Sequence, residues 1–265
     1  MYTENKNKNE LVDSAIDINS PKKKRHNEMS FLEHLKELRK RIFYSLGFIL
    51  LFFIISWNFV DKIYNWLSLP VLKFLPKGEK LAFTSLTEPF MMYVKLAFIA
   101  GIFLSIPFIF YQLWLFIAPA LYPKEKKMVL PFVFFTSIFF IIGGAFGYFF
   151  VFPWACRFFL EIGKDFHAII TIDEYFSLAF RVLIGIAAIF ELPVLAYLLA
   201  KLRILTASFL LRNFKYAIVL IFIIAAVITP TPDAITQSLF AAPMIILYLL
   251  SILIAKIVGP KPDEN

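Results

Sequence analysis

The sequence predicts an all-α membrane protein with six transmembrane helices, and three observations carry that prediction. Of its 265 residues, 60% are hydrophobic and only 17% are charged, which is far from the composition of a soluble domain. Several apolar runs approach or exceed the ~20 residues that a helix needs to cross ~30 Å of hydrocarbon. Short polar segments separate these runs, and nothing in the chain requires a second folded domain.

The six spans follow one another with short connections. We expect them over residues 42–60, 89–116, 129–152, 174–199, 216–228 and 234–257. Pro107 should kink the second span, and Pro243 should interrupt the sixth, because proline removes a backbone hydrogen bond. In the third span, Gly143, Gly144 and Gly147 should let neighbouring helices approach closely.

The segments outside the spans complete the organisation. We expect residues 1–28 to form a basic, disordered N-terminal tail, residues 29–258 the membrane domain and residues 259–265 a short C-terminal tail. Ser30 and Glu33 fit a capping box for a helix that lies on the interface and runs into the first span. Residues 61–88 contain a short amphipathic piece that caps the outer face, and residues 155–173 form a second outer loop. Lys95 should snorkel outward from the second span, and Asp233 should be the N-cap of the sixth.

The distribution of basic residues predicts the orientation. Most of the 27 lysine and arginine residues lie in the N-terminal segment, in the loops after the second and fourth spans, and in the C-terminal tail. Cytoplasmic loops carry such an excess. Four lysines of the first outer loop weaken this bias without reversing it. Both termini are therefore expected in the cytoplasm.

The loop over residues 116–127 has an unusual composition for a turn. It carries a single carboxylate, Glu125, among three lysines, with Phe116 and Tyr122 nearby. As a structural element, Glu125 would stabilise the N-terminus of the third span. As a recognition element, it would bind an incoming guanidinium on an otherwise basic surface, and a shielded bidentate contact would contribute ~1.5–3 kcal/mol. The basic context favours recognition.

Glu191 is the most informative polar residue inside the membrane. It interrupts the apolar run over residues 182–194, where a charge costs at least ~2.5 kcal/mol. It should face a groove or the bundle interior, be protonated, or have a partner. Arg181 is ten residues away, about 15 Å along a helix axis, so a direct pair is not expected. Alternatively, Glu191 is a hydrogen-bonded carboxyl with a purely structural role. Gln237, near the start of the sixth span, is by itself typical of a contact between helices.

Enzyme chemistry finds little support in the residue types. The three histidines form no His-Glu-x-x-His pair, and neither a Gly-x-Ser-x-Gly sequence nor a phosphate-binding Walker loop is present. One cysteine, Cys156, excludes an internal disulfide and a multi-cysteine metal site. We expect no enzymatic activity and no cofactor.

Four motifs together resemble the TatC subunit of the twin-arginine translocase. They are His34-Leu-x-Glu-Leu-Arg-x-Arg41, Phe116-x-Ala-Pro-Ala-Leu-Tyr-x-x-Glu125, Phe190-Glu-x-Pro-Val194 and Thr229-Pro-Thr-Pro-Asp-x-x-x-Gln237. The resemblance covers nearly the whole chain from residue 31 to residue 258. It implies a cupped six-helix bundle beneath an outer cap, in the bacterial cytoplasmic membrane, with both ends inside.

The resemblance also implies a function and its residues. Such a protein is the receptor for signal peptides with paired arginines on folded cargo, and it assembles with single-span TatA- and TatB-type partners, powered by the proton-motive force. Signal-peptide binding is implied for Glu125, Phe116, Glu37, Leu38 and Arg39. The membrane groove or a partner contact is implied for Glu191, Gln237, Pro230 and Asp233.

Two other functions are alternatives to this one. A proton-coupled secondary transporter would use Glu191 as its coupling carboxylate, but the halves of the chain show none of the residue similarity expected of inverted repeats. Solute uptake by the purified protein would support that alternative. A structural scaffold without its own ligand would instead show no binding of peptide or partner.

Overall fold

The computed structural model describes residues 31–73, 81–117, 129–166, 169–229, 231 and 233–259. Residues up to Lys40 and residues from Arg41 on form two compact units. The packing reported below is that of the second unit. Serine 30, the predicted N-cap of the first helix, lies outside the described residues.

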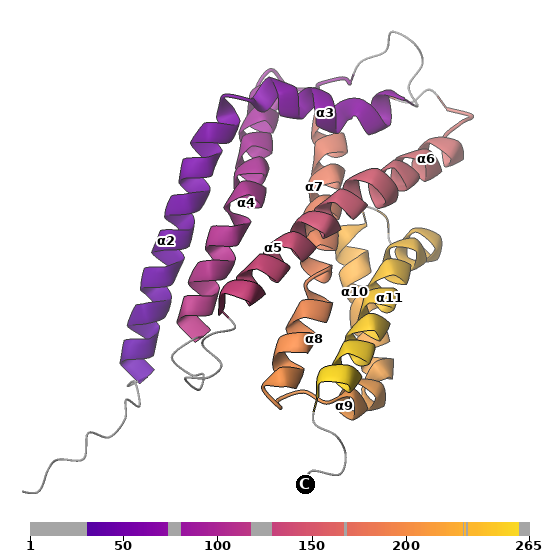
Figure 1. Cartoon of the computed structure of the whole chain (residues 1–265). Coiled ribbons are helices and arrows are strands. Elements are labelled where there is room, and N and C mark those ends of the chain that lie inside the picture. The colour runs from indigo at the N-terminus through magenta and orange to yellow at the C-terminus, as the bar shows by residue number, and fades with distance from the viewer. Residues whose placement is uncertain are drawn as a thin grey trace, which may run out of the picture. The chain divides into compact units, whose positions relative to one another are not determined.

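The described residues form a succession of helices (Figure 1). They are α2 (Phe31–Trp57), α3 (Val60–Leu72), α4 (Glu88–Ile117), α5 (Val129–Phe146), the π-helical segment η3 (Gly147–Val151), α6 (Phe152–Ile162), α7 (Ile172–Ile189), α8 (Leu192–Lys201), α9 (Ala207–Arg212), α10 (Phe214–Ile228) and α11 (Ala234–Val258). Among these residues, a parallel β-bridge joins Ala82 to Thr171.

These helices provide the six spans that the sequence predicts. Four stretches are long and apolar enough to cross a membrane by themselves: Glu88–Ile117, Leu130–Ile162, Ile172–Lys201 and Ala234–Val258. A fifth comes from α2, which is followed by α3 after a bend of 84°. The sixth is α10, whose 15 residues extend only about 22 Å. The all-α, six-span fold class is thereby confirmed.

α3 is the amphipathic piece expected after the first span. Its buried side includes Leu67 and Val71, whereas Trp66 and Leu69 are exposed. The carbonyl of Leu67 accepts a hydrogen bond of 2.8 Å from the hydroxyl of Tyr175 in α7. A second tyrosine hydroxyl, from η3, donates to the carbonyl of Trp66 at 2.5 Å. Hydrogen bonds and apolar burial together hold α3 across the ends of the spans.

Two predicted interruptions are wrong. The third span does not end before residue 155, because α6 continues the helix to Ile162. Ala155 and Cys156 are buried there, while Arg157 and Glu161 pair at 4.0 Å on the exposed side, so packing on one face sustains the helix. The sixth span also continues through Pro243 without a break, since one missing backbone hydrogen bond is tolerated in a membrane helix.

α7 is the central helix of the second unit. It packs against α4, α5, α10 and α11, and ten of its residues are buried. Close approach to α5 depends on Gly143, because a Cβ there would lie only 2.8 Å from the Cα of Ala187. This agrees with the predicted role of the glycines. Gly101 likewise permits the close approach of α4 to α2, since a Cβ added there would lie 2.8 Å from the backbone nitrogen of Phe53.

Asp233 is the N-cap of α11, as predicted. Its carboxylate accepts hydrogen bonds from the backbone N–H of Thr236 (2.8 Å) and from the hydroxyls of Thr236 and Thr231 (both 2.6 Å). The hydrogen bonds from Thr231 and Thr236 lower the pKa of Asp233 from 3.8 to about 2. The cap is therefore ionised over the physiological pH range.

Replacing this cap should destabilise the protein in a pH-dependent manner. We expect Asp233→Ala to lower the melting temperature in detergent by about 2–4 °C at pH 7. Because folding lowers the pKa, the contribution is complete above about pH 4 and is lost as the pH falls toward 2. The difference from the wild type should therefore shrink near pH 2. Asp165→Ala, in an exposed turn, is the control, and an equal effect of both changes would contradict the capping role.

Candidate functional site

Glu191 lies at the break between α7 and α8, within the third motif. The helix stops at Ile189 and restarts at Leu192, with Pro193 in its first turn. Proline has no N–H to continue the α7 hydrogen-bond pattern and suits the first turn of a new helix. Glu191 occupies the N-cap position of α8, where the helix dipole favours a carboxylate. The sequence Glu191-Leu-Pro193 thus favours a helix break at this position.

The Glu191 side chain is nearly isolated from polar groups. It is 7% exposed, and neither carboxyl oxygen has a hydrogen-bond partner within the described part of the chain. Arg181 is exposed and forms no ion pair with it there, as the ten-residue spacing predicted. Burial of this carboxyl without a hydrogen-bond partner therefore costs desolvation free energy within a membrane span.

Gln237 joins the last two spans. Its side-chain amide donates to the backbone carbonyl of Phe222 in α10 at 3.0 Å. A polar side chain that bonds to a neighbouring helix is common in membrane bundles. The structure thus gives Gln237 a packing role beside any contact with a partner. Pro230 lies outside the described residues, and Asp233 caps α11.

The residues implied for signal-peptide binding occupy three segments. Phe116 is half-buried in the last turn of α4. Glu125 falls in the stretch 118–128, outside the described residues. Along α2, Glu37 and Leu38 are half-buried and Arg39 is exposed. The arrangement of these residues as one binding site is a prediction.

A polar contact between α2 and α4 was missed by the sequence analysis. The guanidinium of Arg41 donates to the side-chain oxygen of Gln112 at 3.1 Å. Gln112 is only 9% exposed, so this bond satisfies a buried amide five residues before the end of α4. Arg41 is the last residue of the first motif, and the sequence offered only Gln112 as a polar residue within an apolar span, without indicating its partner.

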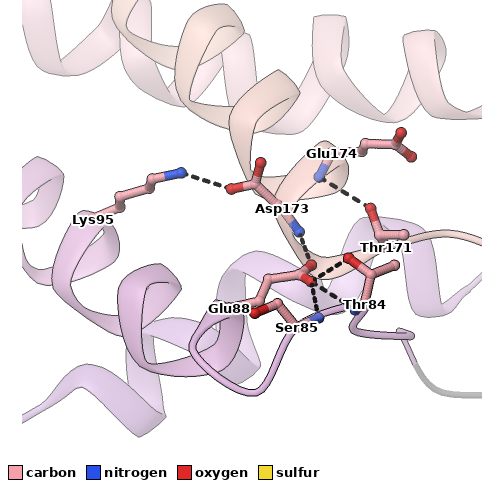
Figure 2. Close-up of polar contacts among 7 residues, drawn as sticks. All are labelled: Thr84, Ser85, Glu88, Lys95, Thr171, Asp173 and Glu174. Atoms are coloured by element: carbon pink, nitrogen blue, oxygen red, sulfur yellow. Dashed lines mark hydrogen bonds and ion pairs between the residues drawn. The ribbon is translucent and has the colours of Figure 1, made fainter.

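A larger polar network joins the starts of α4 and α7, and Figure 2 shows it. One oxygen of Glu88 accepts from the backbone N–H of Thr84 at 2.7 Å and of Ser85 at 3.3 Å. The other oxygen accepts from the backbone N–H of Asp173 at 2.9 Å. Asp173 in turn pairs with Lys95 at 2.6 Å. Lys95, predicted to snorkel outward, thus ends in an ion pair.

The sequence contained a signal for half of this network. Ser85-Leu-Thr-Glu88 has the spacing of a capping box, in which the glutamate reaches back to the residues before the helix. The link to Asp173 could not be read in the same way, because the two residues are 85 positions apart. A tertiary contact of that kind has no local pattern.

An apolar groove lies among α5, α8 and α11. Its volume is about 580 Å³, and Phe135, Pro193, Tyr197 and Ile257 are among its lining residues. Lys201 lines it too and donates to the hydroxyl of Tyr197 at 3.2 Å. Glu191 does not line this groove. Over the described ranges, no group of three His, Cys, Asp or Glu side chains could hold a metal ion.

Comparison with known proteins agrees with these features. The family model for the Sec-independent protein translocase protein (TatC) matches residues 33–243. The TatC protein of Koribacter versatilis is 46% identical over 236 residues, covering 88% of this chain and 87% of that protein. The TatC protein of Helicobacter pylori is 48% identical over 233 residues, covering 88% and 89%.

A solved structure shows the same fold. The crystal structure of a twin-arginine translocase receptor, TatC, matches with a TM-score of 0.77 at 34% identity, over 85% of this chain and 99% of that chain. Sequence and fold therefore agree over nearly the same residues. The chain belongs to the TatC family of Sec-independent protein translocase proteins, which are membrane-embedded translocase components and not enzymes.

Proposed function

We propose that this chain is the receptor and core subunit of a twin-arginine protein translocase. It binds twin-arginine signal peptides of folded cargo and assembles with TatA- and TatB-type single-span proteins. It lies in the bacterial cytoplasmic membrane with both termini in the cytoplasm, and the proton-motive force drives export. The supporting observation is the family match over residues 33–243, which contains all four sequence motifs and all of their candidate residues.

The signal-peptide site uses Glu125 and Phe116, together with Glu37, Leu38 and Arg39 of α2. Glu125 is the only carboxylate in a loop with three lysines. An arginine of the peptide can bind it through two parallel hydrogen bonds, which a lysine cannot reproduce. Phe116 shields the contact from water and so strengthens it. Arginine is thereby selected over lysine at a similar net charge.

The membrane part of the site uses Glu191, Gln237, Pro230 and Asp233. Glu191 is buried without a partner among the described residues, so a polar group of an inserted partner or peptide would relieve its desolvation. Asp233 is the N-cap of α11 and Gln237 lies in its first turn, close in sequence to Pro230. The proton-coupled transporter is not favoured, because a family of protein translocase components matches the chain over most of its length.

Peptide affinity tests the receptor function. Purified protein in nanodiscs should bind a signal peptide with Arg-Arg about 10- to 100-fold more tightly than the same peptide with Lys-Lys. Glu125→Ala should abolish that ratio, because it removes the bidentate acceptor. Isothermal titration or fluorescence anisotropy gives both affinities. Glu161→Ala, which removes an exposed carboxylate of α6, should leave the ratio unchanged.

Three results would count against the receptor function. Equal affinity for the two peptides would show that arginine is not read. An Arg-Arg preference that survives Glu125→Ala would move recognition to other residues. Uptake of a solute by the protein alone, without partners, would revive the transporter.

A further inference from the structure

A second groove lies beside the outer ends of α6 and α7, and none of the residues proposed for peptide binding lines it. Its volume is about 470 Å³, within the range of small-ligand sites. One wall is apolar and includes Phe159 and Leu160 of α6. The other wall is charged and belongs to the first three turns of α7. A groove with one apolar and one charged wall suits an amphipathic ligand.

Two opposite charges mark the ends of the charged wall. Glu174 lies in the first turn of α7 and Arg181 lies seven residues later, so both are on one face of the helix. Their Cα atoms are about 10 Å apart along the axis, and they form no ion pair with each other. The neighbouring Asp173 is already paired with Lys95. Figure 2 shows the Glu174 carboxylate pointing away from that network.

Neither end of the wall is satisfied by the described part of the protein. No hydrogen bond or ion pair of the Glu174 carboxylate or the Arg181 guanidinium occurs there, and both side chains are exposed. Arg181 lies nine residues beyond the start of α7, about 14 Å into the span. A guanidinium at such depth is costly unless it finds a counter-charge.

The direction of the side chain indicates where that counter-charge lies. Helical side chains lean toward the N-terminus of their helix, so Arg181 reaches back toward Glu174 and the membrane surface. The guanidinium is thereby directed outward, toward the lipid phosphates, and the carboxylate lies further out. From the hydrocarbon outward, the groove offers an apolar wall, a cation and an anion.

We propose that this groove binds the head group of phosphatidylethanolamine from the adjacent leaflet. Its acyl chain packs on Phe159, Leu160 and Leu178. Its phosphodiester accepts hydrogen bonds from Arg181, which suits the planar guanidinium. Its protonated amine, two carbons further from the glycerol, donates to Glu174. The order of charges in this lipid matches the order along α7.

An anionic lipid such as phosphatidylglycerol fits less well. Its phosphate can also pair with Arg181, but its head group brings no cation to Glu174. The carboxylate then stays unpaired beside a second negative charge. The structure thus assigns affinity for phosphate to Arg181 and the choice of head group to Glu174.

Native mass spectrometry of the detergent-purified full chain tests this assignment. The probes are phosphatidylethanolamine and phosphatidylglycerol with identical acyl chains, titrated separately. We expect phosphatidylethanolamine to bind about 10-fold more tightly. Arg181→Gln should weaken both lipids about 10-fold, whereas Glu174→Gln should weaken only phosphatidylethanolamine and remove the preference.

Matched controls come from the exposed pair on α6. Arg157→Gln and Glu161→Gln remove the same charges outside the groove and should change neither affinity. Arg181→Lys keeps the charge but loses the planar fork, so it should weaken both lipids less than Arg181→Gln does. Melting temperature with added lipid provides a second readout, and it should rise more with phosphatidylethanolamine for the wild type alone.

Each contrary result would overturn the proposal. Tighter binding of phosphatidylglycerol would show that the head-group amine is not recognised. An unchanged preference after Glu174→Gln would have the same meaning. Equal losses in the variants of the groove and of the α6 pair would indicate general surface charge rather than a site.

Discussion

Gly101→Ala is expected to destabilise the protein by about 1–3 kcal/mol, although alanine is the better helix former. The added Cβ would lie 2.8 Å from the nitrogen and 3.0 Å from the Cα of Phe53. Both atoms belong to the backbone of α2, so no side chain can rotate away. The two helices must separate, and they lose contacts along their whole interface. Chemical or thermal unfolding in detergent measures the change.

Gly47→Ala on α2 is the matched control. A Cβ at Gly47 meets nothing within 4 Å, so only the intrinsic preference of the helix changes. We expect a gain of up to about 1 kcal/mol. Two identical substitutions should thus have opposite signs. If Gly101→Ala were as favourable as Gly47→Ala, the close approach of α2 and α4 would be contradicted.

Glu191→Leu should make the protein more stable and less functional. The carboxyl is buried, and its oxygens lack hydrogen-bond partners among the described residues. An apolar side chain of similar size removes the unmet desolvation, and we expect a gain of about 1–3 kcal/mol. Export of a folded reporter in cells should fall, because the proposed polar contact in the membrane is lost. Unfolding and export assays report the two effects separately.

Glu191→Gln separates the two contributions. Glutamine keeps the shape and a polar group, so little of the gain in stability should appear, while the loss of the carboxylate should still reduce export. A loss of stability in Glu191→Leu would show that the carboxyl has a structural partner. Full export by both variants would remove Glu191 from the proposed membrane site.

The sequence predicted the fold well where the signal was local. Apolar runs gave the six spans, and the cap at Asp233 was visible from residue type and position. The continuation of α6 to Ile162 was not, because Trp154 is typical of a membrane interface, where a span is expected to end. Burial of Ala155 and Cys156 against other helices decides that case. Pro243 was likewise judged by its local effect, whereas the surrounding bundle sustains α11.

In the candidate site, too, local features were predictable from the sequence and long-range contacts were not. The apolar run around Glu191 predicted an unusual carboxyl, and the structure adds that a helix break accommodates it. Gln112 and Asp173 were missed as partners of Arg41 and Glu88, since each pair is more than 70 residues apart. Sequence spacing cannot reveal a contact of that range. The groove beside α7 required both the fold and the pattern of paired and unpaired charges.

The network at Glu88 also has a consequence for the order of membrane insertion. Its carboxylate satisfies its own helix start at once, but the amide of Asp173 that it also binds is synthesised 85 residues later. At about 5–20 residues per second, the ribosome needs roughly 4–17 s to add that stretch. During this interval Asp173 is not yet present to neutralise Lys95. Asp173 of α7 supplies a backbone N–H to Glu88 and a carboxylate to Lys95. Both contacts therefore form together, when α7 packs beside α4.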